Sequence, residues 1–313
     1  MARPRVVVLD DWQDGFGPAA LAQVRERADV TIYRDHAATL DELARRLDGA
    51  VAVVLMRERT AFGADVFARA PSLRLLIQTG GGLAHVDQAA AEAHGVRLTT
   101  TGGPDYPVVE LTIGLLIGLL RRIPWADRAL RAGEWPGYVG DDCHGKTLGI
   151  LGFGRIGSGV ARVATALGMP VVAWGPTLSD ERAAAGGATR LELDDVLRRA
   201  DVLSIHLRLS PQSRGLLSAE RLALLRPSAY LINTARGAIV DEAALAEMLE
   251  SGRLAGAALD VFGQEPLPVD HPLRRLDNVV LTPHIGWPSA GNYAFWARRA
   301  EEQLLAFLDV ARS

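Results

Sequence analysis

Short apolar runs alternate along the chain with segments in which apolar residues recur at helical spacing. The runs predict strands at Val6–Leu9, Val51–Met56, Leu73–Gln78, Thr147–Leu151, Val171–Trp174, Val202–His206, Ala229–Asn233, Gly256–Asp260 and Val279–Thr282. Helical spacing predicts helices that include Leu40–Leu47, Ser158–Leu167 and Asp241–Ser251. This alternation is typical of an α/β protein with doubly wound parallel sheets, covered by helices on both faces.

Two segments indicate where one domain gives way to another. The segment Thr99–Pro107 is rich in Thr, Gly and Pro, which favours a linker, and a long apolar helix at about Val108–Arg122 follows it. Pro124, Gly133 and Pro136 then indicate an irregular arm.

A second turn, around Gly286, Pro288 and Gly291, precedes a final amphipathic helix that ends near Val310. A length of 313 residues favours two domains. We therefore predict a first domain of residues 1–100 completed by residues 288–313, with a second domain of residues 101–287 inserted into it.

Composition excludes several classes of protein. The formal net charge is −3 and no run of Lys or Arg suggests nucleic acid binding. The single cysteine, Cys143, excludes an internal disulfide framework and a cysteine-based metal cluster, and we predict no metal site. The apolar runs Val6–Leu9 and Leu111–Leu120 are too short for a secretion signal and a membrane span. We expect a soluble cytoplasmic protein.

The most informative motif is a glycine-rich turn between a predicted strand and a predicted helix. Its sequence, GFGRIG, carries glycines at Gly152, Gly154 and Gly157. The first glycine allows the tight turn, the second lets a pyrophosphate approach, and the third permits close packing of helix and strand. The helix N-terminus adds N–H donors and a favourable dipole. A βα turn without a ligand is the alternative, but this context favours a dinucleotide site.

The residue that selects the cofactor is missing from its usual place. An acidic residue commonly ends the next strand and binds the ribose hydroxyls of NAD, yet Gly175 stands there. No Arg lies beside it to bind the 2′-phosphate of NADP. Candidate phosphate contacts are Arg155, Thr177, Ser179 and Arg182. The choice between NAD and NADP stays open.

Three polar residues follow predicted strands in the order Arg236, Glu265 and His284. Reduction of a 2-keto acid needs a proton donor, which a histidine supplies near neutral pH, and a nearby carboxylate favours its charged form. An arginine fork pairs with the substrate carboxylate. Each residue alone could be structural, and His206 is a rival histidine, for which we favour a structural or cofactor-side role.

The first domain offers a possible anion site at Gly80, Gly81 and Gly82, after a predicted strand. Consecutive backbone N–H groups can form a nest for a substrate carboxylate, although a flexible turn is an equally simple interpretation. Arg57 and Arg59 follow another strand and could contribute, but at least one is expected to be a solvated surface residue.

The chain resembles the D-isomer-specific 2-hydroxyacid dehydrogenase family. The resemblance rests on GKTLGILGFGRIG, INTARGAIVDEAAL, GAALDVFGQEP and LTPHIG, in order, between about Gly145 and Gly286. It implies a Rossmann-like nucleotide domain inserted into a flavodoxin-like substrate domain. It also implies a homodimer built through the nucleotide domain, with the helix at Val108–Arg122 and the arm at Trp125–Tyr138.

The resemblance also implies roles for individual residues. The catalytic residues would be Arg236, Glu265 and His284. Cofactor contacts would be Gly152, Gly154, Arg155, Ile156, Gly157, Gly175, Leu207, Thr234, Ala235, Arg236, Asp260, His284 and Gly286, with Asp260 near the nicotinamide amide. Substrate contacts would be Gly81, Gly82, Arg57 and Arg236.

Some positions restrict the substrate. Family members that use formate carry Gln in place of Glu265, so the resemblance disfavours formate. Phosphoglycerate-type members use arginines near positions like Arg57, which leaves a phosphorylated substrate open. Trp287 stands where a small residue is frequent and could narrow the pocket.

We therefore expect an oxidoreductase that moves a hydride between NAD or NADP and a small 2-hydroxy or 2-keto acid, with D stereochemistry. Two alternatives remain: an NADH-sensing corepressor-like binding protein on the same scaffold, because fold does not settle function, and a phosphite-type dehydrogenase.

Overall fold

The computed structural model describes residues 3–17 and 19–310, which form two compact units. Unit 1 contains the described residues up to Pro104 and from Pro288 onward, and unit 2 extends from Asp105 to Trp287. The first division falls after Pro104, whereas the sequence prediction placed it after residue 100. The outermost residues of the predicted first domain, 1–2 and 311–313, lie outside the described residues.

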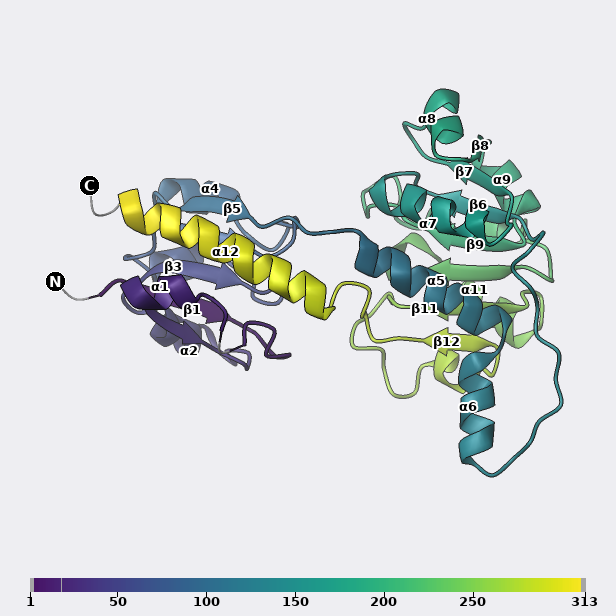
Figure 1. Cartoon of the computed structure of the whole chain (residues 1–313), viewed down its shortest axis with the longest axis horizontal. Helices are drawn as coiled ribbons and strands as arrows, with labels where there is room; N and C mark the ends of the chain where they lie inside the picture. The colour runs from purple at the N-terminus through teal and green to yellow at the C-terminus, as the bar shows by residue number, and fades with distance from the viewer. Residues whose placement is uncertain (1–2, 18, 311–313) are drawn as a thin grey trace. The chain divides into compact units, whose positions relative to one another are not determined.

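Unit 1 is built on a five-stranded parallel sheet (Figure 1). Its strands are β1 (Arg5–Leu9), β2 (Asp29–Ile32), β3 (Ala50–Leu55), β4 (Leu75–Gln78) and β5 (Arg97–Thr100), in the order β2-β1-β3-β4-β5. This is the flavodoxin-like order, in which ligands bind at the carboxyl ends of β1 and β3.

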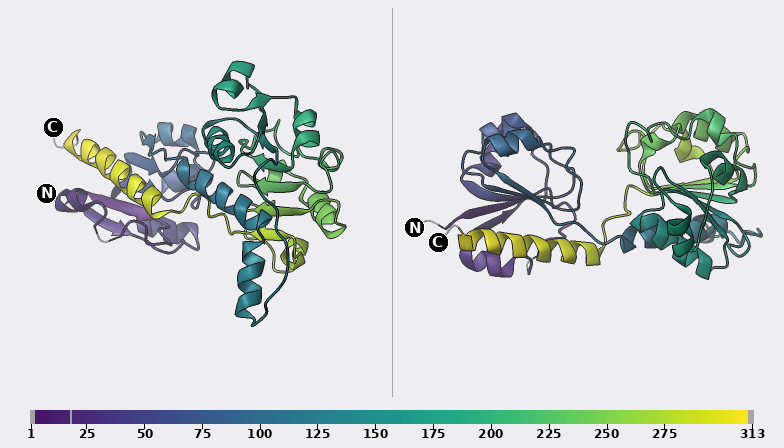
Figure 2. Two further views of the ribbon diagram at one scale, coloured as in Figure 1. Left: turned by 45° about the vertical axis from the view of Figure 1, so that its right-hand side comes forward. Right: turned by 90° about the horizontal axis from the view of Figure 1, so that it is seen from above.

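Helices cover both faces of this sheet. They are α1 (Ala22–Arg27), α2 (Leu40–Leu47), α3 (Ala64–Ala68), α4 (Gln88–Ala93) and α12 (Ala290–Val310). The core on one face joins α2, α3 and α4 to the strands. On the other face, α12 lies beside α1, although the two are far apart in sequence (Figure 2). The C-terminal helix therefore completes the unit that the N-terminal strands begin.

Unit 2 is built on a seven-stranded parallel sheet. Its strands are β6 (Leu148–Leu151), β7 (Val171–Trp174), β8 (Thr189–Arg190), β9 (Val202–Ile205), β10 (Tyr230–Asn233), β11 (Gly256–Leu259) and β12 (Val279–Leu281). The order β12-β11-β10-β9-β6-β7-β8 reverses direction at β6 and β9, as in a Rossmann fold, and dinucleotides bind at such a reversal.

Two separate clusters of buried side chains cover the faces of this second sheet. One cluster includes α5 (Tyr106–Leu120), α7 (Arg155–Ala166) and α8 (Asp180–Ala185). The other includes α9 (Leu193–Arg199), α10 (Ala219–Leu222) and α11 (Glu242–Glu250). The predicted α/β class with helices on both faces of parallel sheets is confirmed.

All the predicted strands are present, but three short strands were missed. These are β2, β5 and β8, and each lies at the edge of its sheet. Their residues are only partly buried or exposed, so they lack the continuous apolar run by which a central parallel strand is recognised.

The helix after the glycine turn, predicted to include Ser158–Leu167, begins at Arg155. One prediction nearby was wrong. The segment after Pro124, predicted to be an irregular arm, begins with helix α6 (Ile123–Arg131), because proline is well tolerated in the first turn of a helix. Among the helices of the described residues, none has the length and apolar character to cross a membrane.

Candidate functional site

The glycine turn of unit 2 needs glycine at two positions for steric reasons. Gly152 has φ of +96°, and a Cβ there would lie 2.6 Å from the His206 carbonyl carbon. At Gly157 a Cβ would lie 2.2 Å from the Gly152 carbonyl oxygen. A Cβ at Gly154, in contrast, would have no atom within 4 Å. The backbone is therefore tight at the first and third glycines and open at the second.

The open side of this turn suits a diphosphate. Gly154 precedes the first turn of α7 in an extended conformation, and the N–H groups that begin a helix are available to an anion. Arg155, at the first helical position, has an exposed side chain whose Nε lies 2.5 Å from Asp105 Oδ2. The residues present therefore fit the pyrophosphate of a dinucleotide.

His206, the rival histidine, lies behind the same turn. Its Nε2 atom is 2.8 Å from the Ser204 hydroxyl oxygen, and burial lowers its pKa to about 4. The ring is therefore neutral at physiological pH and poorly suited to donating a proton. The backbone N of the next residue, Leu207, would lie 2.8 Å from a Cβ at Gly152, so the 206–207 peptide forms one wall of the turn.

The end of β7 has room for the missing acidic residue. Gly175 is buried, and a Cβ there would make only ordinary contacts, 3.5 Å from Leu178 Cβ. Of the candidate phosphate contacts, Arg182 donates to the carbonyl oxygens of Thr177 (2.8 Å) and Phe153 (3.5 Å). It is therefore tied to both the glycine turn and the loop after β7.

Arg236 is held by the asparagine that ends β10. The buried Asn233 side chain accepts a hydrogen bond from Ala235 N–H and donates one to the Arg236 carbonyl oxygen, both at 3.0 Å. One guanidinium N–H of Arg236 donates to the Ala235 carbonyl oxygen at 2.7 Å, and the side chain is exposed. Sequence reasoning had treated Asn233 only as the end of a strand.

Glu265 and His284 form a close pair. Glu265 Oε2 lies 2.7 Å from His284 Nδ1, while Oε1 accepts a hydrogen bond from Phe262 N–H at 2.9 Å. Burial raises the pKa of the Glu265 carboxyl, but the hydrogen bonds from His284 and Phe262 and the charge of Arg236 outweigh it and lower the pKa overall. The carboxylate is therefore ionised and oriented toward the imidazole.

Asp260 organises the loop that carries His284. Its carboxylate accepts hydrogen bonds from Thr282 Oγ1 (2.6 Å), Ile285 N–H (2.8 Å) and Gly286 N–H (2.9 Å). Burial raises the pKa of the Asp260 carboxyl, and these hydrogen bonds only partly offset the effect. His284 has φ of +55° in this loop, a conformation that costs free energy for a residue other than glycine and that the surrounding bonds must maintain.

In unit 1, the predicted anion nest lies beside Arg57. A Cβ at Gly80, which has φ of +82°, would lie 2.2 Å from Arg57 Nη1. Among the described residues, neither Gly81 nor Gly82 donates a backbone hydrogen bond to a protein acceptor. Sequence reasoning missed Glu58, whose carboxylate lies 3.5 Å from Arg57 Nη2 and beside Gly82.

His85 is a second residue that sequence reasoning missed in this region. Burial lowers its pKa, with a smaller opposing effect of Glu58. Within residues 3–17 and 19–310, neither ring nitrogen has a hydrogen-bond partner. No motif singled out this histidine, because its place beside Glu58 and Arg57 arises from the fold.

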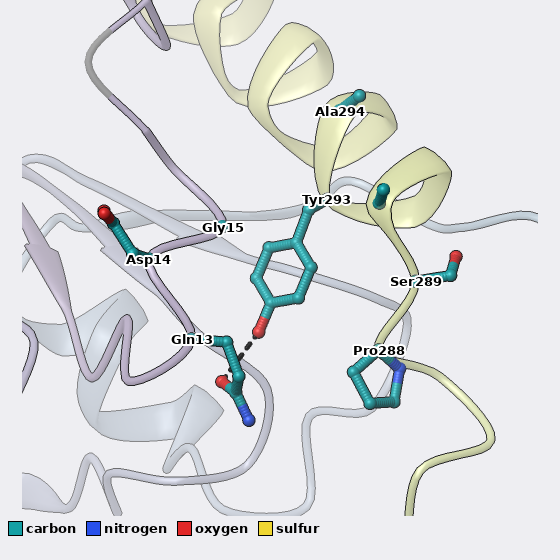
Figure 3. Close-up of a pocket in the computed structure, with 8 residues that line it drawn as sticks. Gln13, Asp14, Gly15, Pro288, Ser289, Tyr293 and Ala294 are labelled. Atoms are coloured by element: carbon teal, nitrogen blue, oxygen red, sulfur yellow. Dashed lines mark hydrogen bonds between the residues drawn. The ribbon is translucent and has the colours of Figure 1, made fainter.

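A separate pocket of about 460 Å³ lies on unit 1, lined by the segments 13–15 and 288–294. In Figure 3, Tyr293 projects from α12 and its hydroxyl donates to Gln13 Oε1 at 2.8 Å. A Cβ at Gly15 would lie 1.7 Å from the Tyr293 ring, so the ring packs directly on that glycine. Gln13 also accepts a hydrogen bond from Arg59 at 2.7 Å, so Arg59 takes part in the hydrogen bonding around this pocket.

Comparison with known proteins agrees with this fold. Residues 113–286 match the NAD binding domain of the D-isomer specific 2-hydroxyacid dehydrogenases. The chain is 38% identical to a D-3-phosphoglycerate dehydrogenase of Mycobacterium tuberculosis, over 100% of the chain and 56% of that protein. It therefore spans about half the length of such relatives.

Other relatives are matched over nearly their whole length. A glyoxylate reductase of Aeropyrum pernix is 37% identical over 98% of this chain and 93% of that protein. The crystal structure of a phosphoglycerate oxidoreductase from Vibrio cholerae superposes with a TM-score of 0.88 at 32% identity, covering 99% of this chain and all of the other. The chain belongs to the D-isomer specific 2-hydroxyacid dehydrogenase family, and its unit 2 carries the NAD binding domain of that family.

Proposed function

We propose that this protein transfers a hydride between NAD or NADP and the second carbon of a small 2-hydroxy or 2-keto acid, with D stereochemistry. The observation that carries the proposal is the 2.7 Å pairing of His284 with an ionised Glu265, in the same unit as a glycine turn that fits a dinucleotide. A nicotinamide supplies or accepts the hydride, and the side chains of the chain manage the proton and the charges.

Each proposed catalytic residue has a distinct task. Negative charge develops on the substrate carbonyl oxygen during reduction, and His284 gives its Nε2 proton to that oxygen. Glu265 favours the imidazolium form and holds Nδ1, so that Nε2 faces the substrate. Arg236 pairs its planar fork with the substrate carboxylate and polarises the carbonyl.

We infer that the substrate is an unphosphorylated acid. Gly81 and Gly82 offer N–H groups to a single carboxylate, and Arg57 lies beside the preceding Gly80. The pairing of Arg57 with Glu58 at 3.5 Å cancels much of its charge, which favours a monoanion over a doubly charged phosphate. Relatives are named for 3-phosphoglycerate and for glyoxylate, so a phosphorylated and an unphosphorylated keto acid are compared in the assay.

The proposed cofactor contacts follow the glycine turn and the neighbouring strand ends. We propose that the amides of Arg155 and Ile156 contact the pyrophosphate, and that the loop at Thr234 and Ala235 contacts the nicotinamide half. Because Gly175 provides no carboxylate, both NADH and NADPH belong in the assay. An enzyme that uses these cofactors is expected in the cytoplasm, where they are made and recycled.

We also infer a homodimer formed through unit 2. Helix α6 has no buried residue, and large apolar side chains on it and on the following arm are exposed, with Leu130 58%, Trp135 90% and Val139 95% accessible. Apolar groups gathered on adjoining segments commonly mark an interface. Light scattering should give a dimer mass for the native chain and a monomer mass for Leu130→Glu/Trp135→Glu, and a native monomer would refute the inference.

The function is tested by following NADH and NADPH oxidation with glyoxylate, hydroxypyruvate, pyruvate, phenylpyruvate and 3-phosphohydroxypyruvate. We expect turnover of at least one unphosphorylated keto acid and formation of the D-hydroxy acid. His284→Ala should abolish turnover and keep cofactor affinity. Cofactor binding without reduction of any keto acid would overturn the proposal.

A further inference from the structure

Glu242 links the start of α11 to the loop that carries Glu265. Its Oε2 atom accepts a hydrogen bond from Gly263 N–H at 3.0 Å, and its Oε1 lies 3.1 Å from His271 Nε2. Both side chains are mostly buried, with 21% of Glu242 and 20% of His271 exposed. His271 Nδ1 accepts from Leu273 N–H at 3.4 Å, so its Nε2 carries the proton that faces Glu242.

The peptide between Phe262 and Gly263 is held on two sides. Its N–H, on Gly263, donates to Glu242, and it packs against Gly237, where a Cβ would lie 2.0 Å from the Phe262 carbonyl carbon. The N–H of the preceding peptide, on Phe262, donates to Glu265 Oε1 at 2.9 Å. Gly237 directly follows Arg236, so this one peptide joins the loop of Glu265 to the loop of Arg236.

We propose that Glu242, held in place by His271, is a positioning residue for the Glu265–His284 pair. By fixing the Phe262–Gly263 peptide it keeps the N–H of Phe262 directed at one Glu265 oxygen, which leaves the other oxygen at 2.7 Å from His284 Nδ1. This inference rests on the proposed role of Glu265 and His284 in proton transfer.

Loss of the Glu242 carboxylate has a specific consequence for His284. The Gly263 N–H loses its protein acceptor and the loop can relax, so the distance between Glu265 and His284 increases on average. The charged groups that act on this pair are Glu265, Asp260 and Arg236, and none of them is altered. A weaker pairing holds the imidazole less firmly in the orientation that turns Nε2 toward the substrate, which lowers kcat/KM for keto acid reduction about 3–10-fold.

The experiment compares Glu242→Ala, the shortened Glu242→Asp and the isosteric Glu242→Gln. Glu247→Ala is the matched control, because Glu247 lies on the same helix and lines the same cavity of about 440 Å³ but pairs with Arg253. The hydrogen bond between His284 Nδ1 and Glu265 is followed by NMR in the chain without cofactor, through the downfield Nδ1 proton signal, which is assigned from His284→Gln. The kcat/KM for keto acid reduction, the cofactor Kd and the Tm are measured in parallel.

We expect Glu242→Ala and Glu242→Asp to move the Nδ1 proton signal of His284 upfield, as expected for a longer hydrogen bond to Glu265, and to lower kcat/KM about 3–10-fold, with the cofactor Kd unchanged. Glu242→Gln, whose amide oxygen can still accept from Gly263, should remain near the native chain, as should Glu247→Ala. If Glu242→Ala does not fold, Glu242→Asp decides alone. An unmoved Nδ1 proton signal of His284 in a folded variant overturns the proposal, even if Tm falls. Because the NMR measurement needs no substrate, it decides this inference even if no keto acid is reduced.

Discussion

Glu265→Gln tests the proposed chemistry most directly, because it removes the charge of Glu265 with little change in the shape of the side chain. The glutamine oxygen can still accept the hydrogen bond from Phe262 N–H, which is 2.9 Å long in the native chain. The amide N–H₂ group then faces His284 Nδ1 and donates to it. That arrangement favours a neutral imidazole with its proton on Nε2, and a neutral imidazole is a much weaker acid toward the substrate than an imidazolium.

The size of the effect follows from the geometry of the pair. A hydrogen bond that involves a charged group contributes about 1.5–3 kcal/mol. Because about a third of each side chain is exposed, at 33% for His284 and 36% for Glu265, water screens the interaction and the lower end of this range applies. A loss of about 1.4 kcal/mol in the transition state corresponds to a roughly tenfold lower rate.

The sign of the pH dependence of stability follows from the lowered pKa of the Glu265 carboxyl. The pKa of Glu265 itself is lowered by the fold, so its contribution to stability is present above the ordinary carboxyl pKa and is lost as pH falls through the lowered value. The variant should lack that acid-dependent loss.

The assay is kcat/KM for keto acid reduction between pH 5 and 10, with the cofactor Kd as a control. We expect roughly tenfold less activity than in the native chain, with the cofactor Kd unchanged. Native activity in the variant would refute the idea that the charge of Glu265 supports proton donation by His284.

Further variants test other parts of the site. Arg236→Lys should lower kcat/KM by roughly 10–100-fold, because a point charge replaces a planar fork and about 1.5–3 kcal/mol of charged hydrogen bonding is lost. Gly175→Asp fits sterically and should raise the NADH over NADPH ratio of kcat/KM at least tenfold, since its carboxylate binds ribose hydroxyls and repels a 2′-phosphate. Gly157→Ala forces a Cβ to within 2.2 Å of the Gly152 carbonyl and should weaken cofactor binding and stability by about 1–3 kcal/mol, visible in Kd and Tm. Glu58→Gln should lower the KM for an anionic substrate about 2–5-fold, as expected for a partly exposed ion pair, and an unchanged or raised KM would argue against a role for Arg57.

The parts of the fold that the sequence predicted are those with continuous apolar runs. The central strands β3, β6 and β9 are almost wholly buried, and burial on both faces gives a continuous apolar run in the sequence. The edge strands β2 and β8 carry exposed and partly buried residues, so nothing in their composition separates them from loops. Their position depends on pairing with a neighbour that is distant in sequence.

The candidate site divides in a similar way. The residue types of Arg236, Glu265 and His284 and their order after strands were visible in the sequence, because parallel strands direct their carboxyl ends to one edge of the sheet. The supporting contacts of Glu242 and Asp260 could not be predicted, because each joins segments that are distant in sequence. Glu242 bonds Gly263, 21 residues further along the chain, and Asp260 bonds Gly286, 26 residues further along. No local pattern predicts which backbone N–H a carboxylate will accept.

The geometry of the proposed catalytic residues is therefore a shared property of three loops. The Asn233 side chain donates a hydrogen bond within the loop of Arg236, and the Asp260 carboxylate accepts one from the loop of His284. Gly237 lets the loop of Arg236 pack against the Phe262–Gly263 peptide, next to the residue that bonds Glu265. A Cβ at Gly237 would meet three backbone atoms of that peptide within 2.4 Å, and a peptide plane cannot move aside as a side chain can. Substitutions in one loop must consequently displace the side chains of another, so double variants across these loops should deviate from additivity, as expected for residues that share partners.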